Sequence, residues 1–226
     1  MVQYTDLSIN ARVALCLIYA EKMIPIIKTM IDCCDKGHAG KYSNWRQQTD
    51  HILNLAWRHL QDKTYVDWPA MYRLCDAEQG FLTDDEENGG YGWFEFVQDL
   101  NCSDDENSAT VTDMMIFCFY YALYRFANRQ QGNCLPQDLE WLGMEESEAE
   151  AFSYIEKAAN LHMPLEEVER IEKLIGKMYK LFPFDENDPY GEDISKEFMY
   201  SEFSDTGPQK EMHFLRRLDV ARRMKT

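Results

Sequence analysis

The sequence predicts an all-α protein in which one compact domain, residues 1–226, folds around a central buried helix. Three observations indicate this class. Apolar residues recur at helical spacing along most of the chain, no segment alternates apolar and polar residues as a half-buried strand does, and no low-complexity linker divides the sequence. We therefore expect roughly seven to nine helices around one core.

The central helix is predicted from Thr112 to Arg129. Its middle, residues 114–124, is apolar or aromatic without interruption. A strand of that length would be unusually long, while Thr112 at one end and Gly132 beyond the other are typical of helix boundaries. Because such a helix has no face it can leave in water, other elements must cover most of its circumference. The run is too short for a membrane span, which needs roughly 20 apolar residues.

Three helices are predicted ahead of this element. The first follows Ser8, a good capping residue, and contains Pro25, which predicts either a kink or a division into two helices. The second covers residues 43–62. The third begins at about Trp68, with Pro69 near its first position.

Five segments after the central helix are predicted to be helical: residues 136–142, 145–161, 164–182, 194–203 and 208–225. The third of these has the most regular apolar stripe in the chain. Its acidic residues are expected on the solvated face: Glu166, Glu167, Glu169 and Glu172. The last segment has six Lys or Arg residues against two acidic ones. It is expected to pack on the domain or to form a loosely held tail.

Charge and cysteine content limit the function classes. The formal net charge is −17 and the pI about 4.6, which argues against direct binding of DNA or RNA, because phosphate contacts need a positive surface. A cationic partner, or a requirement for solubility alone, accounts for this excess of negative charge. Seven cysteines, with Cys33 and Cys34 adjacent, indicate reduced thiols. The opening residues have no signal-peptide pattern, so a cytoplasmic location is expected.

One stretch differs from the rest of the chain. Residues 76–106 contain eleven Asp or Glu residues and no Lys or Arg. Concentrated carboxylates repel one another, and this cost is offset if a Lys- or Arg-rich partner neutralises them. Aromatic residues within the stretch are suitable interface anchors. The candidate partner-binding residues are Asp84, Asp85, Glu86, Glu87, Tyr91, Trp93, Asp104, Asp105 and Glu106. A solvated acidic loop with its rings in the core is the competing interpretation.

The same stretch has the spacing of a calcium loop. Asp84, Glu86, Asn88, Gly89 and Glu95 occupy the first, third, fifth, sixth and twelfth positions of an EF-hand pattern. The long third ligand and the absence of a second loop argue against it. A calcium-binding helical protein that uses residues 84–95 is therefore the alternative function.

Catalytic motifs are absent from the sequence. It contains no nucleophile elbow, no zinc-protease motif and no phosphate-binding glycine loop. We accordingly predict no enzymatic activity, no metal and no cofactor.

The beginning of the chain resembles a family of helical bacterial immunity proteins, which are made beside polymorphic or contact-dependent growth-inhibition toxins. The resemblance lies in the acidic, all-helical character of the chain and in two runs, Leu7-Ser8-Ile9-Asn10-Ala11-Arg12-Val13-Ala14-Leu15 and Ala20-Glu21-Lys22-Met23-Ile24-Pro25. It implies a cytosolic, non-enzymatic inhibitor that binds one cognate toxin domain, often a basic nuclease, and occludes its active site. No membrane or direct nucleic-acid contact is implied.

Overall fold

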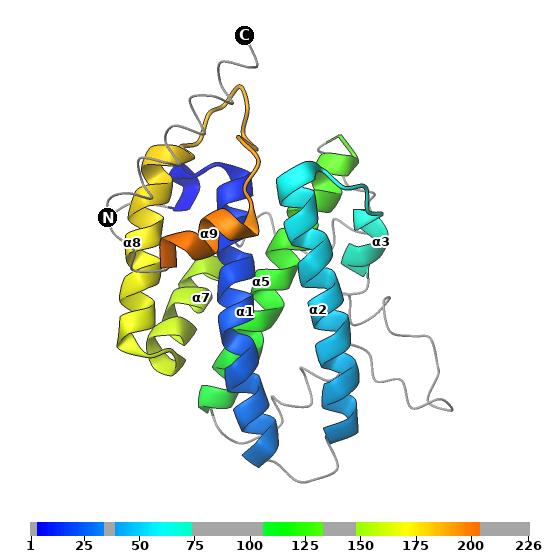
Figure 1. Cartoon of the computed structure of the whole chain (residues 1–226), viewed down its shortest axis with the longest axis vertical. Coiled ribbons are helices and arrows are strands. Elements are labelled where there is room, and N and C mark those ends of the chain that lie inside the picture. The colour runs from blue at the N-terminus through cyan, green and yellow to red at the C-terminus, as the bar shows by residue number, and fades with distance from the viewer. Residues whose placement is uncertain (1–3, 34–38, 74–105, 133–147, 204–226) are drawn as a thin grey trace.

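A computed structural model describes residues 4–33, 39–73, 106–132 and 148–203 (Figure 1). The fold is all-α, as predicted: 79% of this part is helical, and it forms seven α-helices and no strand. After a short 3₁₀ turn (Tyr4–Asp6), the helices are α1 (Ile9–Cys33), α2 (Ala39–Asp62), α3 (Trp68–Arg73), α5 (Glu106–Gln130), α7 (Glu148–His162), α8 (Leu165–Leu181) and α9 (Lys196–Phe203). The predicted helices at 136–142 and 208–225 lie outside the described residues.

Helices α1 and α5 form the centre of the molecule. They cross near the middle of Figure 1, with α2 and α3 on one side and α7 and α8 on the other. The predicted central helix is confirmed, and it begins at Glu106, six residues before the expected start. The first half of α1 is equally enclosed, because every residue from Ile9 to Ala20 is buried. Two buried helices, rather than one, therefore organise the core.

Pro25 does not divide the first helix. Helix α1 runs through it without a break, so the predicted alternative of two helices is wrong. The side chain of Pro25 is exposed, and the Thr29 hydroxyl donates a hydrogen bond to the Pro25 carbonyl at 3.0 Å. A proline on the outer face keeps its ring away from the packed side of the helix.

The start of α1 is bonded to a segment that lies 174 to 180 residues later in the chain. The backbone N–H groups of Ser8, Ile9 and Asn10 donate to the carbonyls of Phe182, Pro189 and Tyr190, at 2.9, 2.9 and 3.2 Å. These contacts supply acceptors for N–H groups that a helix leaves unpaired at its beginning. The predicted cap is also present, since the Ser8 hydroxyl accepts from the N–H of Ala11 at 3.3 Å.

Residues 182–194, which we term the end segment, also reach two other helices. The Tyr190 hydroxyl donates to the Arg125 carbonyl of α5 at 3.3 Å, and the Ile194 N–H donates to the Leu60 carbonyl of α2 at 3.1 Å. The side chain of Asn10 donates to the Gly191 and Glu192 carbonyls. The end segment therefore crosses the end of the bundle where α1 begins and where α2, α5 and α8 finish (Figure 1).

Gly191 is predicted to be required for this crossing. Its φ is +69°, and a Cβ added there would lie 2.7 Å from the Cβ of Ser8. Gly191→Ala should therefore lower the free energy of unfolding by roughly 2 to 4 kcal/mol, from left-handed strain and overpacking together. Urea unfolding followed by circular dichroism measures this loss.

Gly176→Ala is the matched control for that substitution. A Cβ at this exposed position of α8 meets nothing within 4 Å, so alanine should stabilise the helix by roughly 0.5 to 1 kcal/mol. The two substitutions should shift stability in opposite directions. A Gly191→Ala protein as stable as the parent would contradict the proposed role of the end segment.

Candidate functional site

Most of the predicted partner-binding residues lie outside the described part of the chain. This holds for Asp84, Asp85, Glu86, Glu87, Tyr91, Trp93, Asp104 and Asp105, and for the calcium-like stretch 84–95. Glu106 is the first residue of α5, and only its backbone is described. The acidic docking surface therefore stays a prediction.

The described residues contain a second acidic surface, which sequence analysis did not single out. It lies where the end segment crosses the bundle and where α2 connects to α3 (Figure 1). The two parts adjoin, because Lys63 forms an ion pair with Asp193. We term this surface the acidic end. Its exposed carboxylates are Asp62, Asp67, Asp185, Glu186, Asp188 and Asp193.

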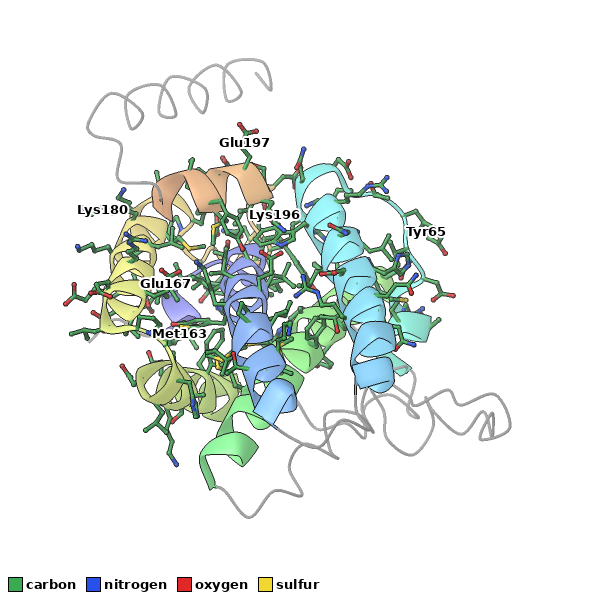
Figure 2. The ribbon with its side chains drawn as sticks, turned by 60° about the horizontal axis from the view of Figure 1, so that its bottom comes forward. Tyr65, Met163, Glu167, Lys180, Lys196 and Glu197 are labelled. Carbon is green, nitrogen blue, oxygen red and sulfur yellow. The ribbon has the colours of Figure 1, made fainter. Side chains whose placement is uncertain are left out.

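Two aromatic side chains are exposed at the acidic end. Tyr65 is 80% exposed and Phe184 41% exposed, and Figure 2 shows Tyr65 on the outer side of the α2–α3 connection. The Arg12 guanidinium lies 5.5 Å from the centroid of the Phe184 ring. Exposed rings beside carboxylates are the combination that interfaces with cationic proteins use.

Asp62 is held in its charged form. Its carboxylate accepts hydrogen bonds from the Thr64 N–H, at 2.9 Å, and from the Thr64 hydroxyl. These bonds lower the pKa of Asp62, since they favour the ionised oxygen. The α2–α3 connection therefore presents a fixed negative charge next to Tyr65.

His59 lies beneath this connection. Its ring packs edge-on against Trp68 and Phe126, with centroid distances of 5.2 and 4.7 Å, and its Nδ1 is 3.0 Å from the Thr64 carbonyl. Because a carbonyl only accepts, Nδ1 carries the proton of the neutral ring. Burial lowers the pKa of His59. The ring thus contributes to packing as a neutral group.

A half-buried carboxylate joins three helices on another face. Glu21 of α1 accepts hydrogen bonds from the Trp57 indole N–H at 2.9 Å and from the Lys196 ammonium at 2.5 Å, and it also bonds to the Tyr200 hydroxyl. These partners come from α2 and α9, and Figure 2 labels Lys196 on α9. Burial and the bond to Glu21 raise the pKa of Tyr200. With all of these donors bonded to it, Glu21 fits a structural role better than a catalytic one.

A groove of about 630 Å³ lies between α1 and the turn from α7 to α8. Glu167 points across it toward α1, where it contacts the Lys22 ammonium, and Arg170 lies 3.6 Å away on its other oxygen. The sequence placed Glu167 on the solvated face, and this was wrong, because the side chain is only 16% exposed. Glu166, Glu169 and Glu172 are exposed, as expected.

Within the described ranges, no three His, Cys, Asp or Glu residues gather as a metal site would require. No helix in those ranges is long and apolar enough to cross a membrane. Cys16 and Cys118 are buried thiols that form no disulfide, and they pack as small apolar side chains. No protein-family model, curated protein or solved structure matches this chain.

His59 predicts a pH dependence of stability. At pH values above its ordinary pKa of about 6.5, the ring is neutral in both the folded and the unfolded protein. In that range it adds no pH dependence to the free energy of unfolding. As the pH falls below that value, the unfolded chain binds a proton that folded His59 resists, so the free energy of unfolding should fall. His59→Phe should weaken this loss between about pH 7 and pH 5, while the same exchange at exposed His51 should not. Identical pH profiles for the parent and His59→Phe would contradict this packing role.

Glu21 predicts a loss of stability on truncation. Glu21→Ala should lower the free energy of unfolding by roughly 2 kcal/mol, because it leaves the enclosed Trp57 N–H without its acceptor. Part of the Lys196 contribution is screened by solvent, since that side chain is 43% exposed. Glu172→Ala, at an exposed position of α8, should change stability by less than about 0.5 kcal/mol. If Glu21→Ala and Glu172→Ala lowered stability equally in thermal or urea unfolding, the result would contradict the stabilising role of the hydrogen bonds to Glu21.

Proposed function

We propose that this chain is an immunity protein that binds a cognate bacterial toxin domain and neutralises it by covering its active site with an acidic surface. The observation that carries the proposal is the stretch 76–106, with eleven carboxylates and no Lys or Arg in a chain of net charge −17. The runs that resemble immunity proteins, within residues 7–25, favour the same class.

The distribution of charge in the described residues supports this proposal. The enclosed charged groups Arg12 and Glu21 are bonded inside the fold. The carboxylates of the acidic end instead face solvent. Charges of this kind create a long-range field that attracts a cationic protein and raises its association rate.

A basic nuclease fits this surface best among toxin domains. A nuclease must bind phosphates, and it does so with Lys and Arg side chains around its active site. An array of carboxylates presents the opposite charge pattern to the same groups, and charge-assisted hydrogen bonds to Arg are strong when water is excluded. Binding there would block the nucleic acid sterically and electrostatically.

The first test is to find and assay the partner. If the gene beside this one encodes a large secreted protein with a variable C-terminal domain, that domain should bind this chain and lose its toxic activity in a one-to-one mixture. Surface plasmon resonance and a nuclease assay measure the two effects. Lack of both binding and inhibition would contradict the proposal for that domain.

Charge reversal locates the surface. A variant with Lys at positions 84, 85, 86 and 87 should associate roughly tenfold more slowly or worse at low salt, and its rate should depend less on ionic strength. The dissociation rate should change less if those four residues mainly steer the encounter. Stopped-flow fluorescence measures both rates.

The matched control reverses four acidic residues that the structure shows to be exposed, Glu166, Glu169, Glu172 and Glu197. This control changes the net charge of the protein by the same amount. If both variants slow association equally, total charge rather than the stretch 84–87 governs the encounter. Unchanged kinetics for the 84–87 variant would remove that stretch from the interface.

A further inference from the structure

We draw no further inference here: the strongest candidate, the groove between α1 and the turn from α7 to α8, already has its Glu167 paired with Lys22, and nothing among the described residues shows what occupies it.

Discussion

The fold depends on the enclosure of the first half of α1. Its residues up to Ala20 are buried on every face, so this half has no solvated side through which errors in packing could be relieved. Burying it requires that its first N–H groups find acceptors inside the protein, because water cannot reach them. The end segment supplies those acceptors, and Gly191 lets it approach Ser8 closely enough to do so. The beginning of the helical bundle is therefore completed by residues near the end of its described part.

Charge is arranged around this apolar centre in two distinct ways. Two enclosed charged groups are bonded within the bundle: Arg12 donates to the carbonyls of Leu7 and Thr5, and Glu21 accepts from donors of α2 and α9. The carboxylates of the acidic end are exposed, where they contribute little to folding and act mainly on approaching molecules. Such a division suits a rigid protein that presents charge to a partner. It is the physical basis for the proposed inhibition of a cationic toxin domain.

Sequence periodicity was sufficient to predict the helices but not the contacts that their ends make. The apolar repeat in α8 and the uninterrupted run in α5 predict those helices, because each must bury its apolar face. The contacts of Ser8 with the end segment join residues more than 170 positions apart, and no local pattern signals them. Glu167 was misplaced for a different reason. It precedes the buried Ile171 and Leu174 by four and seven residues and so shares their face of the helix, but its charge favoured the solvated face in the prediction. Its partner Lys22 belongs to another helix.

The candidate site was only partly accessible to sequence reasoning. Carboxylate density identified the stretch 76–106, whereas the acidic end combines residues from two distant segments that become neighbours through the Lys63–Asp193 ion pair. Tyr65 and Phe184 gave no sequence signal, because an isolated aromatic residue in a connection is as often buried as exposed. Their exposure is a property of the fold.

The most direct test of the central claim is the association rate of the unmodified protein with its proposed partner, a toxin domain encoded beside it, measured as a function of ionic strength. If the acidic surface steers a cationic partner, the rate constant should be high at low salt and should fall steeply toward physiological ionic strength. A rate that is independent of salt, or a domain that does not bind at all, would contradict the account.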